Sequence, residues 1–124
     1  MRPLRRMDIC RTDGGRAEDG FFREKSDCVV RAVAVAHNMP YKDAHELLSL
    51  AGRKDGRGTF RYQMKDLLGE PSGSGGTVQR FLLEHPKGNF IVRVTRHAFA
   101  VRDGIVYDSG SPGAGQHVKD FWTI

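Results

Sequence analysis

The fold is decided by residues 26–36, whose sequence is SDCVVRAVAVA. Ser26 suits the N-cap of a helix, because its hydroxyl can accept a hydrogen bond from one of the unpaired N–H groups that open the helix. Asp27 then stands where the helix dipole favours negative charge. After Cys28 the segment is apolar on all sides, with Arg31 as its only charged side chain, which is typical of a buried helix. We therefore predict a buried helix that begins near Asp27 and around which the rest of the chain packs.

The thiol of Cys28 lies in the first turn of this predicted helix. The positive end of the helix dipole stabilises a thiolate, so this position lowers the thiol pKa and makes the sulfur more nucleophilic. The alternative is that Cys28 is a small hydrophobic residue at the top of a core helix. Free cysteines in proteins are mostly structural, so the segment taken alone favours this second interpretation.

Length and composition predict one domain over residues 1–124, in which residues 1–20 are open to forming a flexible N-terminal arm or, around Leu4, Met7 and Ile9, a short strand. Hydrophobic residues make up 39% of the chain, and no apolar run approaches the ~20 residues that span a bilayer. The basic start of the chain is not followed by the apolar stretch of a signal peptide. Cys10 and Cys28 have neither disulfide nor metal-ligand spacing. We expect a reduced, cytoplasmic protein with no membrane segment, no metal and no cofactor.

The net charge of +5 could attract nucleic acid or an acidic partner. The basic residues are scattered and interleaved with acidic ones, so a solvated surface of mixed charge is favoured over a nucleic-acid groove. Nucleic-acid binding is kept as a weaker alternative. It would use six basic residues from the N-terminus and from one glycine-containing loop, namely Arg2, Arg5, Arg6, Arg53, Lys54 and Arg57.

The order of the expected elements predicts an α+β fold. Helical spacing of the apolar residues, with Thr59 and Thr77 as N-caps of the last two helices, indicates helices over about 27–38, 41–51, 59–68 and 78–85. From residue 89 onward the apolar period changes to two. This period predicts strands over 89–95, 97–102 (separate or continuing the first), 105–108 and a closing edge strand over 118–124. We therefore expect N-terminal helices, including the buried Cys28 helix, to pack on a C-terminal antiparallel sheet.

Asp103-Gly104 is the strongest hairpin signal in the sequence, because this pair favours a two-residue turn. With that turn, Phe99 lies opposite Asp108. The alternation of side chains then places His97 and Asp108 on one face as diagonal neighbours, within reach of each other. A carboxylate beside a histidine selects its tautomer and stabilises the imidazolium. A bulge would separate the two residues, and then Asp108 would only begin a turn and His97 would only end a strand.

A thiol at a helix start, a histidine on a strand and an acid on the next strand supply a nucleophile, a base and an orienting group, in the chain order Cys28, His97, Asp108. With these residues the chain resembles the papain-like cysteine peptidases. In that family the catalytic cysteine opens a central helix on an antiparallel sheet, which supplies the histidine and then an Asp or Asn. The resemblance rests on DCVVRAVA at 27–34 and on HAFAVRDGIVYD at 97–108. The second motif is similar to the hairpin of bacteriocin-processing peptidases and transglutaminase-like proteins, and both motifs resemble those of small phage and bacterial proteins.

Papain-like enzymes usually carry a Gln a few residues before the cysteine, and its amide helps to bind the oxyanion. The preceding residues here are FFREKSD, with no Gln or Asn, so the backbone N–H of Cys28 is the first candidate donor. Lys25, Ser26 or the N-terminal arm is left to supply a second donor, and we expect Ser26 and Asp27 to support the site. Asp27 also places a negative charge beside the thiol, which opposes thiolate formation unless the carboxylate turns away or pairs with Arg31.

The sequence therefore predicts a papain-like thiol hydrolase that cleaves a peptide, isopeptide or related amide bond through Cys28, His97 and Asp108. Its partner would be a protein or peptide substrate, with no part played by a membrane. The alternative is a catalytically inactive binding module on the same fold, such as a phage-encoded protein that binds a host protein. The missing Gln and the small size favour this alternative, and the sequence leaves the substrate and the oligomeric state open.

Overall fold

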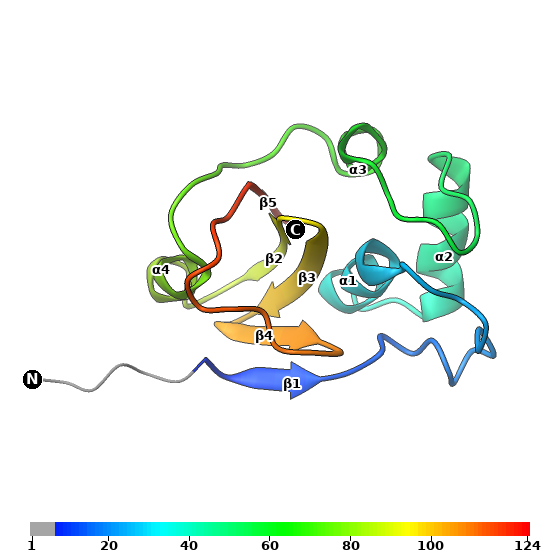
Figure 1. Cartoon of the computed structure of the whole chain (residues 1–124), viewed down its shortest axis with the longest axis horizontal. Coiled ribbons are helices and arrows are strands. Elements are labelled where there is room, and N and C mark those ends of the chain that lie inside the picture. The colour runs from blue at the N-terminus through cyan, green and yellow to red at the C-terminus, as the bar shows by residue number, and fades with distance from the viewer. Residues whose placement is uncertain (1–6) are drawn as a thin grey trace, which may run out of the picture.

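The computed structural model describes residues 7–124, which form an α+β fold with one mixed sheet, as Figure 1 shows. The predicted fold class is confirmed: the helices precede most of the strands and pack on the sheet that the strands form. The helices are α1 (Cys28–Ala36), α2 (Tyr41–Leu50), α3 (Arg61–Leu68) and α4 (Val78–Glu84). The strands are β1 (Ile9–Arg11), β2 (Asn89–Val94), β3 (His97–Arg102), β4 (Ile105–Asp108) and β5 (Asp120–Thr123).

The sheet has the strand order β1-β4-β3-β2-β5. The four C-terminal strands pair antiparallel with one another, as predicted, and β5 forms one edge. β2 and β3 are separate strands that form a hairpin, in which Val94 pairs with His97. The sequence had left this open, because a strand that turns back through two residues has the same apolar pattern as one that continues.

At the other edge the sheet gains an N-terminal strand and becomes mixed, because β1 pairs parallel with β4. The N–H of Val106 donates to the carbonyl of Asp8, and the N–H of Thr12 donates to the carbonyl of Asp108. The backbone of β1 thus satisfies groups that the outer edge of β4 would otherwise expose. Residues 8–12 of the expected N-terminal arm therefore belong to the sheet, and residues 1–6 lie outside the described part of the chain.

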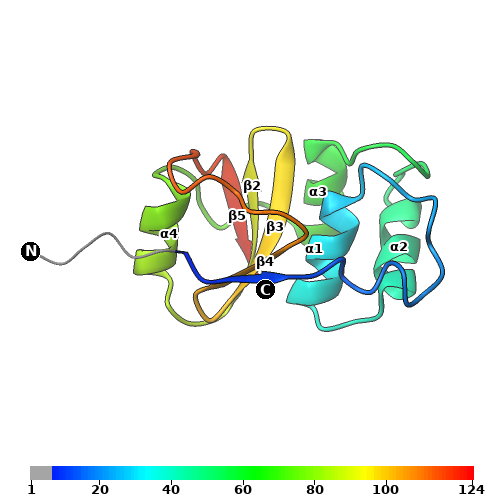
Figure 2. The ribbon, with the colours of Figure 1, turned by 60° about the horizontal axis from the view of Figure 1, so that its bottom comes forward.

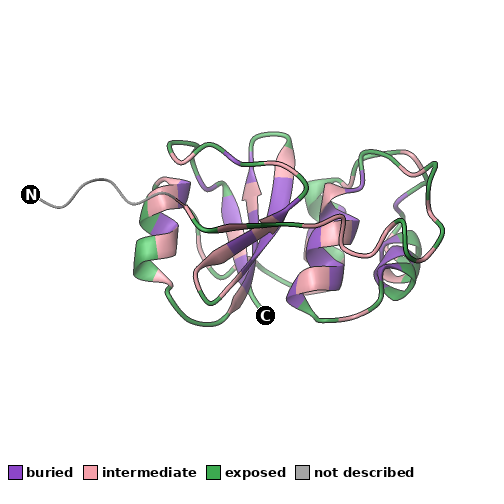
Figure 3. Ribbon diagram, turned by 90° about the horizontal axis from the view of Figure 1, so that it is seen from below, coloured by how far each residue is buried: buried purple, intermediate pink, exposed green. Residues whose placement is uncertain are grey.

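The helix α1 is the central element of the fold, as predicted, and it lies between the sheet and α2 (Figure 2). Its buried side chains belong to one core cluster with Tyr41 and Leu48 of α2 and with Ile91 and Ala100 of the sheet. Figure 3 shows that buried residues gather along α1 and the central strands. An apolar helix packed from two sides holds its N-terminal residue in one position, which is what a reactive site requires.

The opposite face of the sheet packs on α4. Phe90 and Val92 of β2 join Phe81 of α4 in a second core cluster, whereas Ile91, between them in sequence, belongs to the α1 cluster. This division follows from the alternation of side chains along a strand. Thr77 caps α4 as predicted, because its hydroxyl accepts a hydrogen bond from a backbone N–H in the first turn at 3.2 Å.

The start of α3 differs from the prediction. Its N-cap is Phe60 rather than Thr59, because Oε1 of Gln63 accepts a hydrogen bond from the N–H of Phe60 at 2.8 Å. Met64 is buried, as its spacing predicts, but the side chain of Phe60 is 65% exposed. Phe60 lies before the first helical residue of α3, so the helical spacing of apolar residues does not apply to it, and its side chain points to solvent.

Candidate active site

Cys28 is the first residue of α1, and its side chain is half-buried. The N-cap is Asp27, which corrects the prediction of Ser26, and no side chain caps this helix. Ser26 is exposed and has a φ of 53°, a left-handed conformation unlike the extended one of an N-cap residue. The N–H groups of Cys28 and Val29 therefore find no acceptor among residues 7–124 and remain available at the helix start.

His97 begins β3 and Asp108 ends β4. The β3–β4 pairing has the predicted register, and both turn residues, Asp103 and Gly104, have the positive φ of a type I′ turn, at 49° and 78°. The Nε2 atom of His97 lies 2.6 Å from Oδ2 of Asp108. The predicted pairing of these two side chains is confirmed.

Cys28 reaches this pair at the end of the sheet. Phe99, next to His97 on the same strand face, belongs to the cluster under α4, whereas α1 packs with Ala98 and Ala100 of the opposite face. A histidine on the Phe99 face in the middle of β3 would therefore be separated from α1 by the sheet itself. Because His97 is the first residue of β3, its side chain lies at the end of the sheet beside the start of α1, where the imidazole and the thiol shift each other's pKa.

The thiol and the imidazole alter each other's pKa. Burial acts to raise the pKa of Cys28, but the hydrogen bond and positive charge of His97 outweigh it, together with the N–H of Ala98 and the charge of Arg31. The pKa of the thiol consequently lies below its ordinary value. The hydrogen bond to Asp108, followed by that to Cys28, raises the pKa of His97 to about 9. Both shifts favour the thiolate–imidazolium form of the pair at neutral pH.

The carboxylate of Asp27 is only 2% exposed, and its charge is neutralised by neighbouring groups. The guanidinium groups of Arg16 and Arg31 each lie 3.3 Å from Oδ1, and the hydroxyl of Tyr41 donates to Oδ2 at 2.8 Å. The expected pairing of Asp27 with Arg31 is confirmed, so the acid next to the thiol does not oppose the thiolate as a free charge would. A carboxylate only accepts hydrogen bonds, so Asp27 cannot donate one to an oxyanion. It supports the site by anchoring the turn before Cys28.

Arg31 has a larger role than the sequence analysis gave it. Besides Asp27, its guanidinium approaches Oδ1 of Asp108 at 3.8 Å and donates to the hydroxyl of Ser109. It therefore links the first turns of α1 to the end of β4, and so sets the distance between the element that carries the thiol and the one that carries the acid. The sequence offered one signal for this role, because Arg31 is the only charged residue in an otherwise apolar helix.

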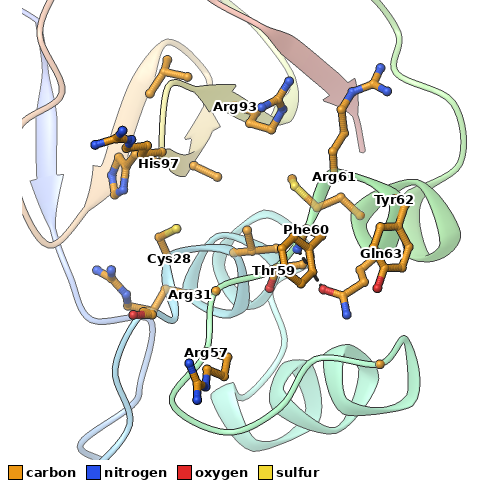
Figure 4. A pocket seen from close by; sticks show the side chains of 18 of the residues that line it. Cys28, Arg31, Arg57, Thr59, Phe60, Arg61, Tyr62, Gln63, Arg93 and His97 are labelled. Carbon is orange, nitrogen blue, oxygen red and sulfur yellow. Dashed lines mark hydrogen bonds between the residues drawn. The ribbon is translucent and has the colours of Figure 1, made fainter.

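Cys28 and His97 line a pocket of about 870 Å³, shown in Figure 4. Its walls are the start of α1, the loop before α3, the first half of α3 and the β2–β3 hairpin. The hydroxyl of Thr59, the residue expected to cap α3, is buried on this wall without a partner among residues 7–124. Asp108 is not part of the lining, because His97 stands between it and the opening. A substrate in the pocket can therefore reach the thiol and the imidazole.

A second polar cluster holds the loop that forms one wall of the pocket. Ligand atoms of Glu24, His45 and Asp55 lie within 4.8 Å of one another, as in some metal sites. The carboxylate of Glu24, however, already accepts hydrogen bonds from Arg53 at 2.9 Å and from the N–H of Gly56 at 2.7 Å. Burial alone would raise the pKa of Glu24, but the hydrogen bonds from Arg53 and His45 lower it to about 2. The cluster is therefore best described as a buried ion pair that anchors the loop.

Of the residues suggested for nucleic-acid binding, the described part of the chain brings only Lys54 and Arg57 to one exposed surface. The side chain of Arg53 is 0% exposed and is committed to Glu24, so it cannot contact a nucleic acid. Lys54 and Arg57 are exposed and line the pocket instead. The other three, Arg2, Arg5 and Arg6, lie outside the described residues.

Comparison of the chain with protein-family models, with curated proteins and with solved structures finds no match. No helix formed by residues 7–124 has the length and apolar character needed to cross a membrane. The inference of function therefore depends on the geometry and chemistry of the site.

Proposed function

We propose that this protein is a papain-like thiol hydrolase of the cytoplasm, which cleaves a peptide, isopeptide or related amide bond in a protein or peptide. The observation that carries the proposal is that Cys28 and His97 line one open pocket and shift each other's pKa, while Asp108 lies 2.6 Å from Nε2 of His97. A cysteine kept only for packing requires neither a histidine partner nor access to solvent. Nucleophilic catalysis requires both, with a third group that orients the base.

In the first half of the reaction, the thiolate of Cys28 attacks the carbonyl carbon of the substrate and forms a carbon–sulfur bond. The π electrons move to the oxygen, which becomes an oxyanion. When this intermediate collapses, the carbon–nitrogen bond breaks and the leaving nitrogen takes a proton from the imidazolium of His97. The products of this half are a thioester on Cys28 and a free amine.

In the second half, neutral His97 takes a proton from water while the water oxygen attacks the thioester. The carbon–sulfur bond breaks, which releases the carboxylic acid and restores the thiolate and imidazolium. Asp108 holds the ring through Nε2, which leaves Nδ1 to face the sulfur. The negative charge of Asp108 stabilises the imidazolium form of His97 in both halves of the reaction.

The oxyanion must be stabilised without the Gln that is usual in papain-like enzymes. The free N–H groups of Cys28 and Val29 at the start of α1 are the first candidates. Ser26 is a further one, because its exposed hydroxyl lines the pocket instead of capping the helix. Loss of one oxyanion donor typically costs about 10²–10³ in rate, so we expect turnover to be slow for this class of enzyme.

The test is the pH dependence of alkylation by iodoacetamide, followed at each cysteine by peptide mass spectrometry. Cys10, exposed on β1, serves as an internal reference thiol in every sample. We expect Cys28 to react at a lower pH than the ~8.5 of a free thiol. Replacement of His97 by Ala should move this profile upward, because the hydrogen bond and charge that stabilise the thiolate are removed.

The inactive binding module remains the alternative outcome of this experiment. The absent Gln favours it, whereas the lowered pKa of the thiol beside His97 and the partial exposure of the thiol speak against it. If Cys28 proves no more reactive than Cys10 and indifferent to His97, the hydrolase proposal fails and the pocket becomes a binding site without chemistry.

A further inference from the structure

The pocket that contains Cys28 is lined by residues of one charge. Its lining includes no Asp or Glu but six basic residues, which are Arg31, Lys54, Arg57, Arg61, Arg93 and Arg96. The whole chain has 20 Lys and Arg against 15 Asp and Glu, so its composition does not account for this separation. The carboxylates of Asp27, Asp108 and Asp120 lie behind the pocket surface, where they pair with some of these bases, and the exposed Asp55 of the neighbouring loop pairs with His45.

The six bases differ in how far their charge is neutralised. Arg31 is paired with buried carboxylates. Arg61 and Arg93 share the single carboxylate of Asp120, at 2.9 Å and 2.7 Å, so this group keeps a surplus positive charge. The remaining three are exposed and form no ion pair with residues 7–124, namely Lys54, Arg57 and Arg96.

The unneutralised charges enter the pocket from different walls. Lys54 and Arg57 belong to the loop before α3, which the buried Glu24–Arg53 ion pair anchors. Arg96 lies in the β2–β3 turn, directly before His97. Figure 4 shows Arg57 on one side of Cys28 and Arg93 and Arg61 on the sheet side. A ligand at the thiol therefore meets positive charge in both directions along its length.

Beside the basic residues, the pocket presents an exposed aromatic pair at the start of α3. The rings of Phe60 and Tyr62 stack with centroids 5.7 Å apart and are 65% and 62% exposed. Such a pair offers a flat apolar surface to a side chain of a bound peptide. Because the rings are already stacked on each other, they are arranged in advance for such a contact.

From these observations we infer that the substrate of the site is an acidic peptide segment, with Asp or Glu side chains on both sides of the bond that Cys28 attacks. This inference rests on the proposed function, because the reacting group is an amide. A pocket with one sign of charge concentrates ligands of the opposite sign and speeds their association. Guanidinium groups bind carboxylates in a bidentate geometry that suits Asp and Glu.

The first experiment compares two alkylating probes at Cys28, negatively charged iodoacetate and neutral iodoacetamide. Both rates are proportional to the fraction of Cys28 that is present as thiolate, so this fraction cancels in their ratio. The double variant Arg57→Glu/Arg96→Glu should lower this ratio about tenfold at low ionic strength. The variant Lys42→Glu/Lys87→Glu, with the same change of net charge outside the pocket, should lower it less than about twofold.

The second experiment asks which polyanion protects Cys28 from iodoacetamide. The probes are a short peptide of alternating Glu and Gly, its counterpart with Lys, and a single-stranded oligonucleotide of equal negative charge. We expect the Glu peptide to slow alkylation of Cys28 but not of Cys10, and the Arg57→Glu/Arg96→Glu variant to lose this protection. The Lys peptide and the oligonucleotide should protect at least tenfold less.

Three results would overturn the inference: equal rate ratios in the two double variants, equal protection by the Lys peptide, or stronger protection by the oligonucleotide. The last would assign the pocket to nucleic acid. Each is distinct from failure of the hydrolase proposal, which is judged only by the pH profile with neutral iodoacetamide and by its response to His97→Ala.

Discussion

The replacement of Asp108 by Asn tests how the fold prepares His97. Asparagine keeps the size of the side chain and removes its charge. In the intact site the pKa of His97 is raised from 6.5 to about 9, with the hydrogen bond to Asp108 as the largest cause. That difference corresponds to about 3 kcal/mol in favour of the charged ring, and it is an upper limit, because the His97 side chain is 30% exposed and solvent screens part of it.

The measurement is best made without the thiol, because Cys28 and His97 titrate as a coupled pair. The variants to compare are therefore Cys28→Ala and Cys28→Ala/Asp108→Asn. The pKa of His97 is read from its ring proton in NMR spectra across the pH range, with the signal assigned by a His97→Gln variant. In Cys28→Ala the pKa should stay above 6.5, and the added Asp108→Asn should lower it by more than about one pH unit, or about 1.4 kcal/mol.

Asp103→Asn in the same background is the matched control. It makes the same charge change at the exposed tip of the same hairpin, and asparagine tolerates the positive φ that this turn position requires. It should leave the pKa of His97 nearly unchanged. If Asp108→Asn, shown by its NMR spectrum to be folded, moves the pKa no further than this control, then Asp108 does not stabilise the imidazolium and the reasoning for a triad is refuted.

Two further predictions concern the buried charges that hold the site. Glu24→Gln leaves Arg53, with a side chain 0% exposed, without its counter-charge and should cost about 3 kcal/mol in urea unfolding, whereas Asp55→Asn, at a side chain 79% exposed, should cost less than about 0.5 kcal/mol. Because the folded pKa of Glu24 is lowered from 4.5 to about 2, the stabilisation by its carboxylate is complete above pH 4.5 and is lost as the pH falls toward 2. Glu24→Gln should therefore reduce the fall in unfolding free energy between pH 4.5 and 2, and an unchanged fall would contradict the assignment. Tyr41→Phe removes the hydroxyl that donates to Asp27 and should lower stability by about 1–3 kcal/mol in thermal unfolding; a variant as stable as the parent would mean that Asp27 is satisfied without it.

The hairpin shows how much of the site could be predicted from sequence. A two-residue turn at Asp103-Gly104 sets the register of both strands, and the register sets which side chains are neighbours. The pairing of His97 with Asp108 followed from these two local rules, without knowledge of the rest of the fold. The cap of α1 could not be predicted in the same way, because Ser26 is a good cap by residue type but takes a left-handed conformation before the turn that Asp27 anchors.

Most of the features that were missed depend on contacts between distant segments. The parallel pairing of β1 with the open edge of β4 was not predicted, because a strand of three residues carries almost no sequence signal for its partner. Arg31 links α1 to Asp108 and Ser109 across the fold, and nothing local to Arg31 identifies those partners. The start of α3 is the exception, because Phe60 caps the helix through its backbone N–H and Gln63, and its side chain is exposed.

The sequence by itself determined the α+β class, the buried helix that carries Cys28 in its first turn and the register that joins His97 to Asp108, because hydrophobic period and turn chemistry act over a few residues. Only the tertiary structure decided that the thiol meets the imidazole at the end of the sheet, that Asp27 is neutralised, and that the surrounding pocket is lined by bases without acids. These properties arise from the packing of α1 against the ends of β3 and β4 and from loops brought together around it. Such long-range arrangements depend on the sum of many weak contacts and have no local signature in the chain.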